Sequence, residues 1–309
     1  MKKINFDGFN SLISVMNHFN TEDICKQTLV KAIWGNNVVC PKCGKHHCKM
    51  SKSGRFHCTQ CNHNFSCTSG MFFSRSRLSL RKWFLAMYLM SSNKKGISSH
   101  QLSRDINVTQ KTAWFMLQKL RMMYAQCDTE ELSGTVEIDE MYLGGAEKNK
   151  HENKKTEGTQ GRSTKTKSAI FGMIQRQGKL VAMKVTDTKA DTLMHIIKQF
   201  IKENTVIYTD ESNSYIRLKK ENYNHEFVRH NENEFVFGDV FTNTIEGFWS
   251  HFKKMVFGTY HSVSKKYLQR YIDEEVYRWN TRKMKESARF ADMFAKSLTY
   301  YDYKAVVTV

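Results

Sequence analysis

The chain has 309 residues, of which 12% are aromatic, and it carries 48 lysines and arginines against 30 aspartates and glutamates, a net charge of +18. This length suits two or three domains, the aromatic content excludes a disordered basic tail, and the charge favours a polyanionic partner. The longest apolar stretch, residues 83–90, is too short to span a bilayer, and no apolar signal segment follows the basic start. We therefore expect a cytoplasmic protein with no membrane partner.

The first segments indicate a helix and then a metal site. Residues 1–34 have apolar side chains at helical spacing and are predicted to form a helical lead-in. Two Cys-x-x-Cys pairs follow, and each pair precedes a Gly or Asn that permits a tight turn. Because thiolates at this spacing surround one Zn²⁺, residues 35–70 are predicted to form a zinc ribbon with one structural Zn²⁺. The predicted ligands are Cys40, Cys43, Cys58 and Cys61.

Residues 71–130 are predicted to contain a helix-turn-helix. Ser98 and Thr109 are candidate N-caps of two short helices joined at Asn107. The second helix has one apolar face and one face with basic and amide side chains, which suits the major groove of DNA. Its candidate DNA-contacting residues are Gln110, Lys111, Lys119 and Arg121. By itself this pattern is equally typical of a helical hairpin that binds nothing.

The segment 134–290 is predicted to be an α/β domain with an RNase H-like mixed sheet. Its pattern is a strand, a hairpin, a helix, a strand, a short fifth strand and a final helical region. The expected strands are 135–138, 169–176, 179–185, 205–208 and one near 226–228, and the expected helices are 192–201 and one from about Thr244. In this fold the first and fourth strands are adjacent. Residues 291–309 are expected to be a C-terminal extension.

Three acidic residues are the candidate catalytic ligands of this domain. Asp139 and Asp210 each end a β-branched run and are therefore predicted at strand tips, while Glu246 begins a helical pattern with Lys253 two turns further on the same face. Clustered carboxylates repel one another unless cations lie between them, and oxygen ligands suit Mg²⁺ or Mn²⁺. The pattern predicts two such ions and phosphodiester chemistry on nucleic acid. Each acid alone is also compatible with an ordinary strand end or helix start.

The sequence contains no motif for binding a nucleotide or a dinucleotide. The sequence contains neither a Gly-x-x-x-x-Gly-Lys loop nor a Gly-x-Gly-x-x-Gly loop, so we expect no nucleotide cofactor.

Six stretches carry a family resemblance that covers most of residues 35–285. They are Cys40-Pro-Lys-Cys43, Arg81-Lys-Trp-Phe-Leu-Ala86, Gln110-Lys-Thr-Ala-Trp-Phe-Met116, Ile138-Asp-Glu140, Asn243-Thr-Ile-Glu-Gly-Phe-Trp249 and Gly258-Thr-Tyr-His261. In these residues the chain resembles bacterial insertion-sequence transposases of the DDE type, specifically the ISXO-like group with an N-terminal zinc ribbon. The resemblance implies metal-dependent cleavage at the ends of a mobile element, followed by attack of the freed 3′-hydroxyl on target DNA.

Carried onto this sequence, the resemblance implies that Asp139, Asp210 and Glu246 hold the two ions. Lys253 would contact DNA near the scissile phosphate, and Lys254 is a further candidate DNA contact. Asn243 precedes Glu246 by one helical turn and is the alternative third ligand or a helper. The implied partner is double-stranded DNA, both element ends and target, bound by a homo-oligomer in association with the bacterial nucleoid. A DNA-binding regulator with an inactive catalytic domain and a nuclease that cuts without joining remain the alternatives.

Overall fold

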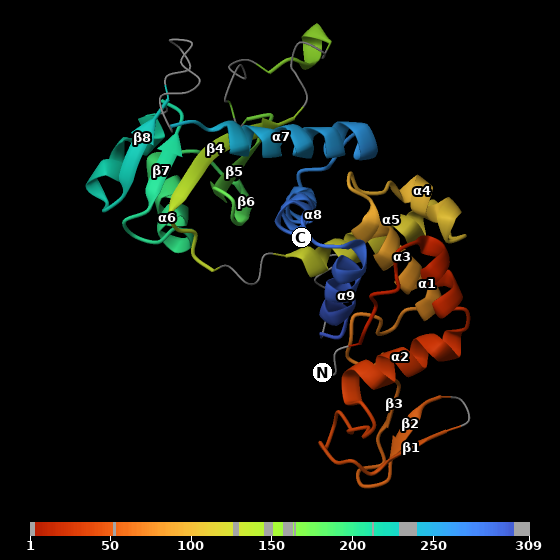
Figure 1. The fold of residues 1–309 in the computed structure, drawn as a ribbon. Coiled ribbons are helices and arrows are strands. Elements are labelled where there is room, and N and C mark those ends of the chain that lie inside the picture. The colour runs from red at the N-terminus through yellow and green to blue at the C-terminus, as the bar shows by residue number, and fades with distance from the viewer. Residues whose placement is uncertain are drawn as a thin grey trace. The chain divides into compact units, whose positions relative to one another are not determined.

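The computed structural model describes residues 4–51, 54–125, 130–144, 151–156, 163, 165–211, 213–228 and 240–299. The chain divides into two compact units (Figure 1). The first unit consists of residues 1–123 and 283–309, and the second consists of residues 124–282. Among the described residues, no helix combines the length and apolar character needed to cross a bilayer.

The first unit begins with α1 (Leu12–His18) and α2 (Glu22–Trp34) and continues as a small antiparallel sheet. The strands of this sheet are β1 (Cys48–Met50), β2 (Phe56–Cys58) and β3 (Asn64–Phe65). The indole ring of Trp34, at the end of α2, contacts the rings of Phe56 and Phe65 at centroid distances of 5.5 and 5.9 Å. These few apolar contacts join the sheet to the preceding helix.

Four further helices complete the first unit. They are α3 (Leu80–Ser92), α4 (Ser99–Asp105), α5 (Gln110–Arg121) and α9 (Glu286–Ser297). Ser98 and Thr109 cap α4 and α5 as predicted, because their hydroxyls accept the backbone N–H groups of Gln101 at 3.1 Å and Thr112 at 3.2 Å. A turn of 3₁₀-helix, η1 (Met122–Tyr124), follows α5.

The helix α9 belongs to the first unit, although the sequence analysis divided its residues between the catalytic domain and a C-terminal extension. Aromatic rings hold it there: Phe294 contacts Phe84 of α3 at a centroid distance of 5.4 Å, and Phe290 contacts Phe6 at 5.1 Å. The chain therefore returns to its N-terminal unit after residue 282. Residues 300–309 of the predicted extension lie outside the described residues.

The second unit is built on a five-stranded sheet with the order β6-β5-β4-β7-β8. Its strands are β4 (Thr135–Leu143), β5 (Ser168–Gln175), β6 (Leu180–Val185), β7 (Val206–Thr209) and β8 (Asn224–Phe227). The first three strands form an antiparallel meander, whereas β7 lies parallel to β4, and β8 lies parallel to β7. Numbered from β4, this order is 3-2-1-4-5, the RNase H-like sheet that the sequence predicted.

Helices cover both faces of this sheet (Figure 1). They are α6 (Ala190–Phe200) with the 3₁₀ segment η4 (Asn213–Lys220) on one face, and α7 (Asn243–Met255) and α8 (Leu268–Asn280) on the other. The short 3₁₀ turn η3 (Glu152–Lys154) precedes β5, and a π-helical turn, η6 (Val256–Tyr260), extends α7.

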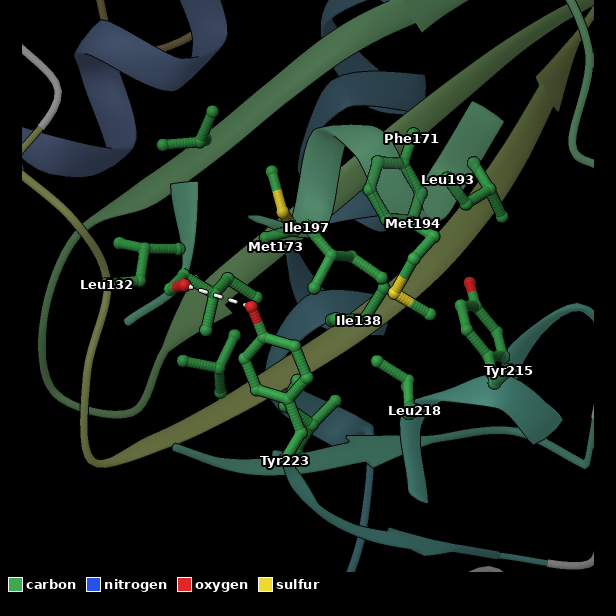
Figure 2. Close-up of a cluster of buried hydrophobic side chains, with 14 of the residues drawn as sticks. Leu132, Ile138, Phe171, Met173, Leu193, Met194, Ile197, Tyr215, Leu218 and Tyr223 are labelled. Carbon is green, nitrogen blue, oxygen red and sulfur yellow. Dashed lines mark hydrogen bonds between the residues drawn. The ribbon is translucent and has the colours of Figure 1, made fainter. Parts of the chain in front are cut away.

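Strand alternation sorts the side chains of β4 between the two faces. The even-numbered Val136 and Ile138 join the cluster under α6, where Figure 2 shows Leu193, Met194 and Ile197 close to Phe171 and Met173 of β5. The odd-numbered positions 137, 139 and 141 face α7 and α8. On that face Gly172 of β5 permits a close approach, because an added Cβ would lie 2.7 Å from the indole of Trp249. The absence of a side chain at this position therefore sets how closely α7 approaches the sheet.

Candidate metal and DNA sites

Four cysteine sulfurs of the ribbon lie within 4.8 Å of one another. The Sγ atoms of Cys40 and Cys61 are 3.7 Å apart, and those of Cys43 and Cys58 are 3.6 Å apart. The backbone turns as predicted, since Gly44 has φ +71° and Asn62 has φ +53°. This donor set fits a tetrahedral Zn²⁺ ion, as the sequence predicted for these residues.

The four thiols differ in their electrostatics: burial raises the pKa of Cys61 to about 12, whereas the surroundings of Cys58 favour its thiolate. Burial raises the pKa of the Cys58 thiol, but hydrogen bonds from the backbone amides of Cys61 and Gln60 and from neighbouring thiols outweigh it, and the resulting pKa is about 6. A thiol with this pKa gives up its proton readily to a metal ion.

The candidate DNA contacts on α5 divide into two kinds. Gln110 and Lys111 are exposed in its first turn, and the Gln110 amide donates to the Ser99 hydroxyl of α4 at 2.8 Å. Lys119 and Arg121 are buried, so in this structure neither lies on an exposed face of α5. The Lys119 ammonium donates to the Phe72 carbonyl and lies over the Phe72 and Trp83 rings, 4.6 and 5.5 Å from their centroids. The Lys119 side chain is therefore part of the packing inside the first unit.

We expect Lys119→Ala and Lys111→Ala to act on different properties. Burial lowers the pKa of Lys119 to about 8, and its removal deletes a buried hydrogen bond to the Phe72 carbonyl, so this variant should lose about 1–3 kcal/mol of stability. Its DNA affinity should show an unchanged salt dependence, whereas Lys111→Ala should keep its stability and lose about one unit of salt slope. Thermal melts and binding titrations at several salt concentrations test both. Equal salt slopes in the two variants would contradict this assignment.

The two aspartates lie at neighbouring positions, Asp139 on β4 and Asp210 just after β7. Asp139 is in the middle of β4, not at its tip as predicted, because β5 pairs alongside as far as Leu143. The parallel pairing with β7 ends earlier, at Glu137 and Tyr208, and Asp210 follows the end of β7 directly. The register places Asp139 and Asp210 two residues beyond this last pair, so both lie where the two strands diverge.

Negative charge is concentrated around Asp139. Burial, followed by the charges of Glu140 and Asp210, raises the pKa of the Asp139 carboxyl to about 7, against the opposing effect of hydrogen bonds from the Glu140 backbone and the Trp249 side chain. The Trp249 indole N–H donates to Asp139 Oδ2 at 3.0 Å. Glu140 in turn accepts a hydrogen bond of 2.5 Å from the phenol of Tyr215. Such a group of acids is stabilised when a cation lies between them.

Helix α7 brings the third acid to the same region. It begins at Asn243, so Asn243 and Glu246 are one turn apart, and both are exposed. The Thr242 hydroxyl donates to Glu246 Oε1 at 3.0 Å. A cleft of about 510 Å³ lies between β4 and α7. Its lining consists of Asp139, Glu140, Met141, Tyr142, Glu246, Trp249, Ser250, Lys253 and Lys254.

The structure thus brings Asp139, Glu246, Lys253 and Lys254 to one cleft, while Asp210 lies beside Asp139 and is not a lining residue among those described. Within the described part of the chain, only the four cysteines form a group of three or more potential metal ligands whose atoms all lie within 4.8 Å. Asp139, Asp210 and Glu246 therefore lie in one region of the second unit, but their carboxylate oxygens do not all lie within 4.8 Å of one another as the cysteine sulfurs do.

Glu137 and Arg176 are two residues of this region that the sequence analysis did not assign to the site. Glu137 is fully buried, and the Arg176 guanidinium Nε donates to its Oε1 at 2.9 Å. The signal in the sequence was the strand alternation, which puts Glu137 on the same face as Asp139. An acid inside an otherwise apolar strand, on a face covered by helices, needs a partner.

The RNase H-like sheet places Asp139 of β4 and Asp210, just after β7, at neighbouring positions, and α7 adds Glu246, Lys253 and Lys254. This arrangement is typical of a DDE-type phosphodiester transferase. Sequence comparison identifies the family. The ISXO2-like transposase domain matches residues 131–280, and the transposase zinc-ribbon domain matches residues 20–64, which includes α2. The chain belongs to the ISXO2-like transposases, and is therefore an enzyme of DNA transposition that uses divalent metal ions.

Relatives found by sequence agree with this family. An uncharacterised protein in the transposable element ISH50 of Halobacterium salinarum is 30% identical over 270 residues, which is 82% of this chain and 89% of that protein. An uncharacterised transposase-like protein of Haemophilus influenzae is 25% identical over 118 residues, 38% of this chain and 94% of that protein. A solved pre-cleavage Mos1 transpososome matches 97% of this chain and 99% of its own with 12% identity and a TM-score of 0.29, too low for a comparison of sites.

Proposed function

We propose that Asp139, Asp210 and Glu246 hold two Mg²⁺ or Mn²⁺ ions at the cleft between β4 and α7, and that this centre cleaves the ends of the mobile element and joins them to target DNA. When bound, a pair of such ions activates the attacking oxygen and stabilises the leaving oxygen of the phosphodiester. The observation that supports this assignment most directly is the cleft, which Asp139 of β4 and Glu246 of α7 line together, with Asp210 beside Asp139.

Glu246 is the favoured third ligand. Its side chain lines the cleft together with Asp139, whereas Asn243 is not among the lining residues that the structure describes. A carboxylate also provides the negative charge that a divalent ion prefers, while an amide offers only a neutral oxygen. Asn243 lies one turn nearer the helix start and is the alternative ligand or a helper.

The exposed lysines extend the site towards DNA. Lys253 and Lys254 line the same cleft as the acids, so a phosphate of the cleaved strand would meet positive charge beside the metal ions. In the first unit, the zinc ribbon and the pair α4 and α5, with Gln110 and Lys111 exposed, are the proposed reader of the element ends. Because two ends must be held for joining, we infer a homo-oligomer on DNA.

The test is an integration assay with Mg²⁺, a duplex from the DNA flanking the gene, and a supercoiled plasmid. We expect joined products from the wild-type chain and from Asn243→Ala, and a rate of joining lower by at least about 100-fold in Glu246→Ala. Joining by Glu246→Ala but not by Asn243→Ala would transfer the third-ligand role to Asn243.

Two wild-type outcomes would overturn the proposal as a whole. Cleavage without joining would identify a nuclease, and DNA binding without either reaction would leave a DNA-binding regulator.

A further inference from the structure

We propose that Glu137 is a positioning residue of the catalytic centre: with Arg176, it fixes the first turn of α7 and thereby holds Glu246 and Lys253 in place beside Asp139. This inference rests on the proposed function, since it assigns a role to the support of the same site. In the proposed site, Glu137 itself contacts neither the metal ions nor the DNA.

The contacts of Glu137 are directed at the start of α7. Its Oε2 accepts the backbone N–H groups of Thr244 at 2.9 Å and Ile245 at 3.1 Å, and its Oε1 accepts the Thr244 hydroxyl at 2.8 Å. The first N–H groups of a helix have no partner within the helix, and a cap residue usually satisfies one of them. Thr242, at the cap position of α7, makes no such bond with its side chain. Glu137 therefore replaces the local cap from a strand more than 100 residues earlier, and its negative charge suits the positive end of the helix.

Arg176 secures this carboxylate from the other side. Besides the ion pair with Glu137, its Nη2 donates to the carbonyl of Phe241 at 3.0 Å, and its guanidinium lies 3.5 Å from the centroid of the Phe241 ring and 4.7 Å from that of Tyr208. Its backbone N–H donates to the carbonyl of Thr135 at 2.9 Å. One arginine thus connects β4, the end of β5, β7 and the segment that leads into α7.

The hydrogen bonds of Glu137 determine the position of the first turn of α7 more specifically than apolar packing can. Replacing a buried ion pair by well-packed apolar residues is often neutral for stability, so stability alone does not require Glu137. Hydrogen bonds to two particular amides fix the rotation and the axial position of that helical turn, because they require specific donor positions, whereas the hydrophobic effect is non-directional. Asp139 makes the next attachment to α7, through the Trp249 indole, and Glu246 lies between the two attachments. A displacement of about 1 Å at a reacting centre can lower the rate about 100-fold.

The experiment compares full-length Glu137→Gln with Ile197→Ala. Ile197 is buried in the cluster on the opposite face of the sheet, under α6, so its replacement destabilises the unit without touching α7. The first measurement is amide hydrogen exchange in the metal-free protein without DNA. In Glu137→Gln we expect exchange in residues 243–255 to rise about 10-fold relative to exchange in residues 190–200. In Ile197→Ala this ratio should stay at or below the wild-type value.

The second measurement is the Mg²⁺ dependence of DNA cleavage at a temperature where both variants remain folded. Glu137→Gln should need at least about 5-fold more Mg²⁺ for its half-maximal rate and should have a lower maximal rate, as expected for a displaced ligand. Ile197→Ala should keep the wild-type Mg²⁺ dependence. If Glu137→Gln does not fold, Thr244→Ala, which removes one of the three hydrogen bonds, should shift both readouts in the same direction by a smaller factor.

Wild-type exchange in α7 together with a wild-type Mg²⁺ dependence in Glu137→Gln, or in Thr244→Ala as its substitute, would overturn the positioning role. A wild-type chain that does not cleave DNA would instead overturn the proposed function. Exchange in α7 would then still decide whether Glu137 anchors the helix, because that measurement needs neither metal nor DNA.

Discussion

Cys58→Ala is expected to lose the bound zinc, unfold residues 40–65 and lower the affinity for element-end DNA at least about 10-fold, while the RNase H-like unit stays folded. The sheet of the ribbon has strands of only two or three residues, and its main apolar contacts join Phe56 and Phe65 to Trp34. So small a core does not offset the conformational entropy of ordering the loops. Structural zinc contributes roughly 10–16 kcal/mol in comparable peptides.

Metal analysis, limited proteolysis and DNA titrations test this expectation, and Cys48→Ser is the matched control. Cys48 lies opposite Cys58 in the register of β1 and β2, but it is not a member of the four-sulfur cluster. Its replacement should leave zinc content, protease resistance and affinity at wild-type values. Loss of zinc in Cys48→Ser to the same extent as in Cys58→Ala would show that the ligand set has been assigned wrongly.

Local patterns predicted the parts of the fold that local physics determines. The Cys-x-x-Cys pairs identified all four members of the sulfur cluster, and the order of strands predicted that Asp139 and Asp210 would be neighbours. The caps Ser98 and Thr109 were correct because an N-cap needs only a side chain and an amide three residues later.

Contacts between distant segments account for what was missed. Lys119 has the spacing of a polar helix position, and nothing near it in sequence indicates that its ammonium donates a hydrogen bond to the Phe72 carbonyl, 47 residues earlier. Strand β4 extends beyond Asp139 because β5 continues beside it, which the pattern of β4 alone cannot report. Strand alternation puts Glu137 on the Asp139 face, but its partners at the start of α7 lie more than 100 residues further along the chain, so the sequence does not indicate its contacts.

Asp139→Asn is expected to abolish both DNA cleavage and joining, with a loss of about 1,000-fold or more, while DNA affinity remains close to that of the wild type. A divalent ion contributes several kcal/mol of transition-state stabilisation, and each 1.36 kcal/mol corresponds to a factor of ten in rate. An amide has nearly the shape of the carboxylate and can keep the hydrogen bond from Trp249, so the fold should persist. The matched control is Asp191→Asn, which removes an exposed carboxylate on α6 and should keep full activity.

The same substitution should stabilise the metal-free protein. Because the pKa of Asp139 rises from 3.8 to about 7 on folding, the folded state binds more protons than the unfolded state between these values. Stability therefore falls as pH rises through this window, and the full cost is present above pH 7. In EDTA at pH 8, Asp139→Asn should gain on the order of 1–2 kcal/mol over the wild type, and this gain should shrink as pH falls towards 4. Saturating Mg²⁺ should reverse the order, since only the wild type then gains binding energy. A variant that is inactive but no more stable in EDTA would show that Asp139 is catalytic but that its burial and its charged neighbours do not destabilise the folded protein.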